Sequence, residues 1–210
     1  MKSFIISNGK ITDYEYCKNL ITKDDYIICA DGGARHAYNM KLEPNLIIGD
    51  FDSMEQKYIE YFRGRDVEFI RHPKDKDKTD THLCVIKAVE FSDEIVLLGA
   101  LGSRLDHSYA NISLLKIGID KNVKMSIDDY QNKIILINKN IVLRDSRGYT
   151  FSLLPFNGGV KGLCVKGARY ELSNVDMEAG DTYGISNLFL DKEVFISIEK
   201  GLLMIVKSKD

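Results

Sequence analysis

Short apolar runs alternate with helical patterns over residues 1–117. Many of the apolar runs have almost no polar position, which is typical of parallel strands that are covered by helices on both faces. The intervening stretches are apolar at helical spacing. The pattern predicts strands at residues 3–7, 26–30, 45–48, 67–70 and 94–99, and helices at 14–21, 54–63, 81–91 and 107–117.

From Lys124 onward, short β-rich runs are separated by glycine-containing turns. This spacing is typical of an antiparallel sandwich or barrel. The chain is therefore predicted to be α/β followed by all-β. We expect a doubly wound, mainly parallel domain at residues 1–122 and an antiparallel β-sandwich at residues 123–210.

Composition and charge limit which binding partners and which cellular compartment are expected for this chain. With 29 basic and 31 acidic residues the net charge is −2, so the chain has no global cationic field for nucleic acid or an acidic membrane. No apolar run is long enough for a signal peptide or a membrane helix. The four cysteines are scattered without a Cys-x-x-Cys pair, which favours buried reduced thiols and a cytoplasmic protein. We expect neither nucleic acid nor a membrane as a partner.

Four polar clusters lie near the carboxyl ends of predicted strands, the edge where open parallel sheets bind ligands. The first is Asp31-Gly32-Gly33. Paired glycines let backbone N–H groups approach an anion or a sugar, and Asp31 could accept hydrogen bonds from ribose hydroxyls. The alternative is a strand-to-helix turn that Asp31 caps.

The second cluster is Gly49-Asp50-Phe51-Asp52-Ser53. If the segment stays extended, Asp50 and Asp52 point to the same side and Phe51 to the other. Adjacent carboxylates repel each other unless a cation lies between them, and Mg²⁺ prefers such hard oxygen ligands. The alternative is an acidic turn in which Asp52 or Ser53 caps the next helix.

The third cluster, residues 74–80, reads KDKDKTD before a predicted helix. Its lysines, including Lys76, could meet phosphates while Asp80 joins the metal. The alternatives are a solvated charged loop and a simple helix cap at Thr79 or Asp80.

The fourth cluster, residues 99–107, is a glycine-rich loop without the Gly-Lys-Ser/Thr of a P-loop. Arg104 could offer its guanidinium to a phosphate, and Asp106 could orient a ligand or only cap the helix. His107 could act as a base or have a structural role. The chain has neither a Gly-x-Ser-x-Gly elbow nor zinc-ligand spacing, so the clusters predict a Mg²⁺-dependent enzyme acting on a phosphorylated compound, with a nucleotide favoured.

In this order, DGG, GDFDS, DKTD and GALGSRLDH with Asn111 after it, followed by GISN at 184–187, resemble the signature of the thiamin pyrophosphokinase family. The resemblance covers nearly the whole chain. It implies an α/β nucleotide-binding domain joined to a β-sandwich, usually as a homodimer. It also implies transfer of pyrophosphate from ATP to the hydroxyl of thiamin, giving thiamin diphosphate and AMP.

The resemblance also implies roles for individual residues. The positions around Mg²⁺ are Asp50, Asp52 and Asp80, which with Arg104 form the expected catalytic set. The positions expected on the ATP side are Asp31, Gly32, Lys76, Asp77, Thr79, Arg104, Asp106 and Asn111. On the thiamin side the motif supplies Ser186 and Asn187, which in this family lie near the dimer interface.

Two departures from the family pattern concern the loop and the thiamin site. Gly102-Ser103 stands where the family often has Gly-Gly before the arginine. The chain has no tryptophan, which some members place against the thiamin rings, so a tyrosine or phenylalanine would take its place.

Two other classes of function use similar residues. A metal-dependent phosphoesterase would also cluster aspartates at a sheet edge, but it normally needs further ligands, often histidine. A nucleotide- or thiamin-binding regulator without catalysis would be expected to carry broken acidic motifs, and here they are intact.

Overall fold

The computed structural model describes residues 1–210 except 53, 76, 145–147 and 210. It divides into two compact units, Met1–Tyr130 and Gln131–Asp210. In the described part of the chain, no helix is long and apolar enough to cross a membrane.

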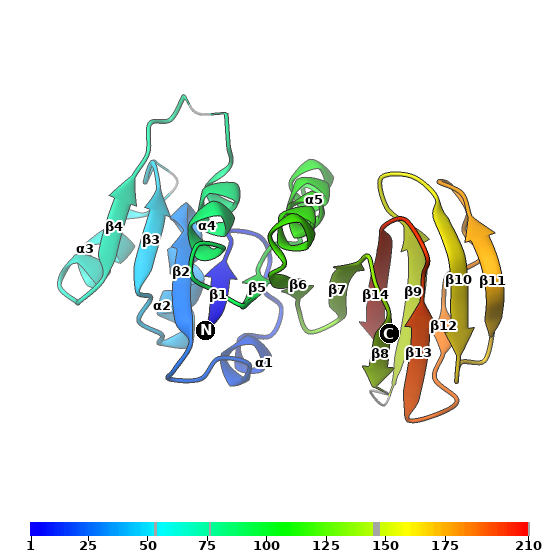
Figure 1. The fold of residues 1–210 in the computed structure, drawn as a ribbon. Helices are drawn as coiled ribbons and strands as arrows, with labels where there is room; N and C mark the ends of the chain where they lie inside the picture. Colours follow the sequence, from blue (N-terminus) through cyan, green and yellow to red (C-terminus); the bar gives the residue numbers. More distant parts are fainter. Residues whose placement is uncertain (53, 76, 145–147, 210) are drawn as a thin grey trace. The chain divides into compact units, whose positions relative to one another are not determined.

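The first unit is a parallel sheet in the order β6-β5-β1-β2-β3-β4 (Figure 1). Its strands are β1 (Lys2–Ile6), β2 (Tyr26–Ala30), β3 (Leu46–Gly49), β4 (Glu68–Arg71), β5 (Glu94–Leu98) and β6 (Lys124–Asp128). Its α-helices are α1 (Tyr14–Asn19), α2 (Ala34–Met40), α3 (Gln56–Arg63), α4 (Asp80–Ala88) and α5 (Leu105–Lys121), and a 3₁₀ turn covers Asp31–Gly33.

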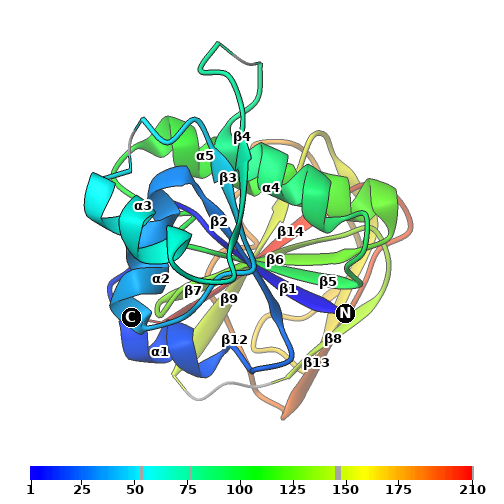
Figure 2. The same cartoon turned by 90° about the vertical axis from the view of Figure 1, so that its left-hand side faces the viewer.

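Helices cover both faces of this sheet, as the nearly continuous apolar strands predict. Figure 2 shows α4 and α5 on one face and α1, α2 and α3 on the other. Alternate strand side chains pack with α1–α3 in one core, namely Phe4, Ile6, Ile27, Cys29, Ile47, Val96 and Leu98. Residues between them, such as Ile5, Ile28 and Leu97, are fully buried, and α4 contacts β1, β2 and β3.

Two elements of the first unit differ from the sequence-based expectation. The segment from Lys124 was expected to begin the antiparallel part, but it pairs in parallel with β5 from Glu94 onward. The 17-residue helix α5 makes the crossover that a parallel strand requires. The short helix α2 was not predicted, because its N-cap Gly33 has no side chain to mark a helix start.

The second unit is an antiparallel β-sandwich, which confirms the predicted fold class. One sheet has the order β12-β9-β14-β7 and the other β11-β10-β13-β8. The strands are β7 (Asn132–Ile137), β8 (Ile141–Arg144), β9 (Tyr149–Pro155), β10 (Val160–Lys166), β11 (Leu172–Met177), β12 (Asn187–Leu188), β13 (Glu193–Ser197) and β14 (Leu203–Lys209). Both sheets contribute to a single core, with Phe151 and Ile205 from one and Leu163 and Val194 from the other.

Candidate active site

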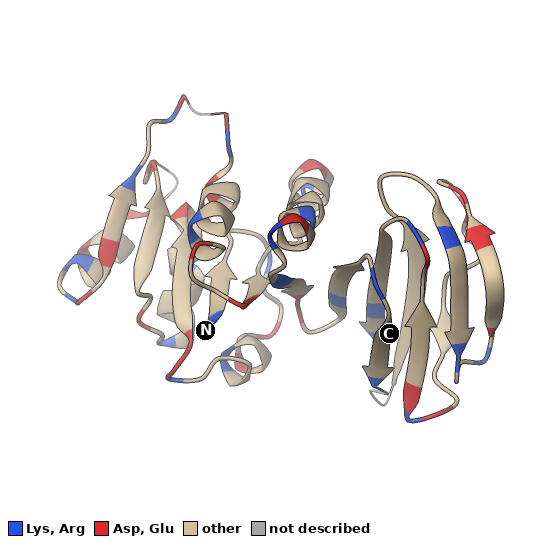
Figure 3. Ribbon diagram, in the orientation of Figure 1, with Lys and Arg blue, Asp and Glu red and all other residues tan. Residues whose placement is uncertain are grey.

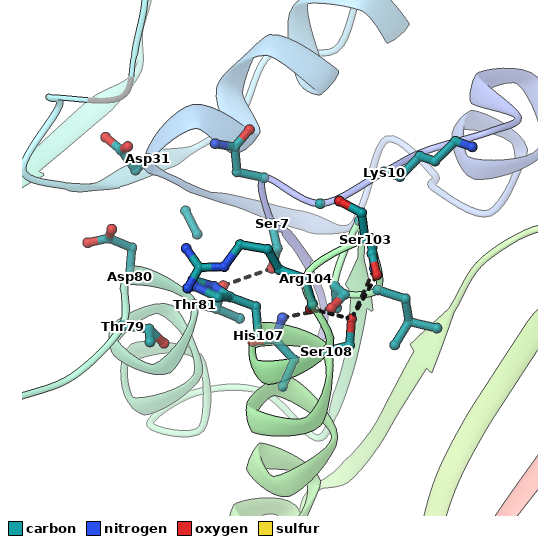
Figure 4. A pocket seen from close by; sticks show the side chains of 18 of the residues that line it. Ser7, Lys10, Asp31, Thr79, Asp80, Thr81, Ser103, Arg104, His107 and Ser108 are labelled. Carbon is teal, nitrogen blue, oxygen red and sulfur yellow. Dashed lines mark hydrogen bonds between the residues drawn. The ribbon is translucent and has the colours of Figure 1, made fainter.

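A pocket of about 710 Å³ opens at the carboxyl ends of β1, β2 and β5 and at the N-terminal ends of α4 and α5 (Figure 4). Five of the site residues expected from the clusters and the family resemblance line it, namely Asp31, Thr79, Asp80, Arg104 and Asn111. Figure 4 shows Asp31 and Asp80 on one side of the pocket and Lys10 on the other, beyond Ser103. The pocket therefore holds both acidic and basic side chains.

Asp31 connects the first two clusters. It is 3% exposed and has a left-handed backbone, with φ of 42°. Its Oδ1 accepts a hydrogen bond of 3.0 Å from the backbone N–H of Phe51. An added Cβ at Gly49 would lie 2.7 Å from the Asp31 Cβ, so only glycine fits there. Asp31 therefore braces the loop after β3, and the N-cap of α2 is Gly33 instead.

The paired aspartates of the second cluster do not line the pocket. The backbone is left-handed at Phe51, with φ of 65°, so the segment is not extended and the alternation argument for Asp50 and Asp52 does not apply. Asp50 Oδ1 accepts a 2.9 Å hydrogen bond from the Asp52 N–H. The exposed Asp52 carboxylate pairs with Lys74 Nζ at 3.0 Å, and this hydrogen bond raises the pKa of Lys74.

The carboxylates of the second and third clusters are the candidate metal ligands. Asp50, Asp52 and Asp80 offer only carboxylate oxygens, which fit Mg²⁺ chemically. Within the described ranges, however, no three carboxylate, imidazole or thiolate groups come close enough to hold a metal ion. Mg²⁺ usually keeps several waters and takes one or two carboxylates plus substrate phosphates. The residues therefore fit a metal that arrives with a phosphorylated ligand rather than a protein-only cage.

The start of α4 distinguishes the two capping alternatives. The Thr79 hydroxyl accepts a 3.2 Å hydrogen bond from the His82 N–H, so Thr79 is the cap. Asp80 is the first residue of the helix, half-buried, and lines the pocket. The next residue, Thr81, shares a 3.0 Å hydroxyl–hydroxyl hydrogen bond with Ser7, which joins α4 to the end of β1.

The charged loop before α4 carries both signs of charge along its length (Figure 3). Asp77 is exposed and does not line the pocket. Lys76 lies outside the described residues.

In the fourth cluster, Arg104 forms an ion pair with Asp106. Arg104 donates to both carboxylate oxygens of Asp106, at 3.2 Å from Nε and 2.6 Å from Nη2. This pairing, together with the backbone N–H of His107, lowers the pKa of Asp106 to about 2. Arg104 and His107 line the pocket, whereas Asp106 does not. Arg104 is also the N-cap of α5, so the capping alternative for Asp106 is not realised.

Two buried polar residues hold the glycine-rich loop against α5. Asn111, only 8% exposed, donates from Nδ2 to the carbonyl of Ala100 at 2.7 Å. The Ser108 hydroxyl accepts from the Gly102 N–H at 3.1 Å and lies 3.1 Å from the Arg104 carbonyl, to which it donates. Asn111 therefore shapes the loop that carries Arg104.

One wall of the pocket was not among the residues predicted from the sequence. It is formed by Ser7, Asn8, Gly9 and Lys10 after β1, together with Arg35 of α2. The rule that ligands bind at strand ends applies to β1 as well and could have found Asn8-Gly9. Gly32, a predicted ATP-side residue, does not line the pocket; an added Cβ there would lie 2.4 Å from the Asn8 side chain, so it packs behind this wall.

In the second unit, the GISN motif has one exposed and one buried member. Ser186 is exposed with φ of 59°, and its N–H donates to Ser152 Oγ at 3.1 Å. Asn187 is 6% exposed. Its Oδ1 accepts from the Tyr170 N–H at 3.0 Å and its Nδ2 donates to the Tyr170 carbonyl at 2.8 Å. Asn187 therefore fixes the backbone of Tyr170, a residue that is 59% exposed.

Two family models match the chain. The model described as the thiamin pyrophosphokinase catalytic domain matches residues 17–127, and the model described as the thiamin pyrophosphokinase vitamin B1 binding domain matches residues 135–203. Among curated proteins, the chain is 28% identical to thiamine pyrophosphokinase of Bacillus subtilis, covering 87% of each chain. It is 27% identical to thiamine pyrophosphokinase 1 of Oryza sativa, covering 87% of this chain and 79% of the relative.

Solved structures are similar over the whole length. The crystal structure of thiamine pyrophosphokinase from Bacillus subtilis superimposes with a TM-score of 0.93 at 25% identity, covering 100% of both chains. The thiamin pyrophosphokinase from Geobacillus thermodenitrificans gives a TM-score of 0.89 at 26% identity, covering 100% of this chain and 98% of the other.

Proposed function

The chain belongs to the thiamin pyrophosphokinase family, and we propose that it transfers the pyrophosphate group of ATP to the hydroxyl of thiamin, giving thiamin diphosphate and AMP. The observation that carries this proposal is a pocket at the strand ends, which unites Asp31, Asp80 and Arg104 from three separate clusters. Acidic and basic groups in the same pocket suit a polyphosphate that binds together with a cation.

The chain's own residues have mainly positioning work to do. The hydroxyl oxygen of thiamin forms a bond to the β-phosphorus while the bond from that phosphorus to the oxygen bridging the α-phosphate breaks, and AMP leaves with the electron pair. Such transfer depends on alignment and charge neutralisation rather than on covalent work by the protein. Arg104, or a lysine of residues 74–78, stabilises charge on the transferred group.

The hydroxyl proton needs an acceptor. Asp80 and Asp52 are the two candidates, and Asp80 is favoured because it lines the pocket and Asp52 does not. One or two of the carboxylates of Asp50, Asp52 and Asp80 would hold Mg²⁺ together with phosphate oxygens of the nucleotide. When bound, the metal supplies neutralisation of the phosphate charge.

The remaining site residues are assigned from the family resemblance. Gly32, Lys76, Asp77, Thr79, Asp106 and Asn111 belong to the ATP side, where Asp106 orients Arg104 and Asn111 supports the glycine-rich loop. On the thiamin side, Ser186 offers an exposed hydroxyl and Asn187 fixes Tyr170. We assign ATP and Mg²⁺ binding to the first unit, and thiamin binding and dimerisation to the second, with the expected boundary at residue 122 moved to follow Tyr130 because β6 belongs to the parallel sheet. We also propose that the protein forms a homodimer and is located in the cytoplasm.

An AMP-release assay with ATP and Mg²⁺, run with and without thiamin, tests the reaction. We expect AMP only when thiamin is present, with one thiamin diphosphate formed for each AMP. A phosphoesterase would hydrolyse a phosphate ester without needing thiamin as an acceptor. Calorimetric binding of ATP or thiamin with no AMP release would instead identify a regulator, and either result would overturn the proposal.

A further inference from the structure

Two backbone carbonyl groups in the segment after β1 accept hydrogen bonds from side chains of α2. The Gly9 carbonyl accepts from His36 Nε2 at 2.8 Å and from Arg35 Nη2 at 3.2 Å. The same Arg35 nitrogen donates to the Asn8 carbonyl at 3.1 Å. Asn8, Gly9 and Arg35 line the pocket, whereas His36 does not and is only 3% exposed. His36 therefore holds the pocket wall from behind.

The hydrogen bonds around His36 determine its tautomer. A carbonyl can only accept, so Nε2 carries the hydrogen, and Nδ1 accepts from the Tyr14 hydroxyl at 2.7 Å. Asn39 Nδ2 donates to the oxygen of that hydroxyl at 3.0 Å. Burial lowers the pKa of His36 to about 4, which keeps the ring neutral. The chain of donors from Asn39 to Gly9 is thus complete.

The other side of the same segment is tied to the glycine-rich loop. The Gly9 N–H donates to the Gly99 carbonyl at 2.7 Å, and the Lys10 N–H donates to the Leu101 carbonyl at 3.0 Å. An added Cβ at Gly9 would lie 2.3 Å from the Gly99 oxygen, so the two segments touch through their backbones. Gly9 is the point where α2, β1 and the loop before Arg104 are joined.

We propose that His36 is a positioning residue for the nucleotide site, acting through the Gly9 carbonyl to hold residues 8–10 and the adjoining glycine-rich loop in the shape that binds ATP. This inference rests on the proposed function only in taking ATP as the ligand. Glycine has wide backbone freedom, so an untethered Gly9 peptide could turn its carbonyl dipole toward the bound phosphates. The His36 and Arg35 hydrogen bonds direct that oxygen into the protein instead.

The test compares His36→Leu with His36→Gln by calorimetric titration with ATP in the presence of Mg²⁺. Leucine removes the donor, whereas the glutamine amide can donate from about the position of Nε2. We expect His36→Leu to raise the Kd for ATP about tenfold and His36→Gln to restore it to within about threefold, since one hydrogen bond is involved. In turnover, KM for ATP should change and kcat should change much less.

Ser3→Ala is the matched control. Ser3 is fully buried at the opposite end of β1, where its hydroxyl is 2.6 Å from that of Ser92. It should lower the melting temperature without changing the Kd for ATP. If His36→Leu behaves in the same way, losing only stability, His36 is merely structural and the inference is wrong.

Tyr14→Phe decides the matter if His36→Leu does not fold. It keeps the ring but removes the hydroxyl that orients His36, and should raise the Kd for ATP about threefold. An unchanged Kd in folded Tyr14→Phe would overturn the inference. Wild-type protein that binds no ATP would overturn the proposed function itself, whereas ATP binding equal in wild type and His36→Leu would overturn the positioning role alone.

Discussion

The Asp31 carboxylate and the Phe51 backbone N–H are joined by a hydrogen bond of 3.0 Å across 20 positions of sequence. One end of this bond belongs to the Asp-Gly-Gly turn in the pocket and the other to the loop of paired aspartates outside it. Both residues have left-handed backbones. Because Asp31 also faces the pocket, the bond transmits the position of a pocket residue to the loop proposed to hold Mg²⁺.

Two substitutions at Asp31 should therefore separate its two roles. Asp31→Asn keeps an oxygen acceptor for Phe51 but loses the charge, so it should retain its melting temperature while kcat/KM falls. Asp31→Ala leaves the part-buried Phe51 N–H without this acceptor and should also lose about 1–3 kcal/mol of stability. Urea unfolding and steady-state kinetics measure the two effects. Equal stability of the two variants would show that the hydrogen bond does not brace the loop.

Asp52→Asn should lower turnover by about two or more powers of ten at saturating Mg²⁺, because it removes a carboxylate proposed to hold the metal. The fold should be unaffected, since Asp52 is exposed and its ion pair with Lys74 contributes little. Asp75→Asn, also exposed and in the charged loop, is the control and should retain its activity. Near-normal turnover of Asp52→Asn would rule out the metal assignment.

Asn111→Leu should destabilise the protein by about 1–3 kcal/mol, because the Ala100 carbonyl loses a buried donor. Activity should fall as well, since the loop before Arg104 would no longer be fixed. Ser113→Ala, on the exposed side of the same helix, should change neither quantity by much. Denaturant unfolding with an AMP-release assay measures both; full activity in a destabilised Asn111→Leu would separate the loop from catalysis.

The lowered pKa of His36 predicts a pH dependence of stability. The unfolded histidine takes up its proton near pH 6.5 and the folded one only near pH 4, so the unfolded chain binds more protons between these values. The contribution is present above pH 6.5, is lost as the pH falls to about 4, and amounts to roughly 3 kcal/mol at most. Unfolding free energies at pH 7 and pH 4.5 should show a larger acid-induced loss in wild type than in His36→Gln. Equal losses would contradict the buried neutral ring.

Cysteine labelling should be selective. Burial raises the pKa of the Cys17 thiol to about 12 and also raises the pKa values of Cys29 and Cys84, whereas Cys164 is partly exposed. Since the thiolate is the reactive form, an alkylating reagent should modify Cys164 first and the other three only on unfolding. Mass spectrometry of the native protein would count the labelled sites, and rapid labelling of Cys29 would contradict its burial.

The sequence predicted the fold well, and the family resemblance of its motifs is confirmed by both family models. Strands such as β2 and β5 were predicted correctly because strands buried on both faces consist of nearly continuous apolar, β-rich runs. Helix α2 was missed because Gly33 provides no capping side chain. The parallel pairing of β6 was missed because the sequence of a short strand with both polar and apolar residues does not indicate which strand it pairs with.

The candidate site was likewise predicted from the sequence only in part. The local pattern alone placed Asp31, Asp80 and Arg104 at strand ends and helix starts, and the structure brings these three into one pocket. Their roles, and those of Asp50, Asp52, Ser186 and Asn187, remain predictions for the experiments above.

What the sequence by itself determined is the set of elements, their order and the chemistry at their ends, because periodicity and turn residues act over a few neighbouring positions. Only the tertiary structure decided which ends meet. The Ser7–Thr81 hydrogen bond spans 74 positions, and the Gly9 peptide is fixed by His36 on one side and Gly99 on the other. Contacts of this kind depend on strand order and backbone direction, which no local pattern contains. They bring three of the four polar clusters into one pocket, which holds both acidic and basic side chains.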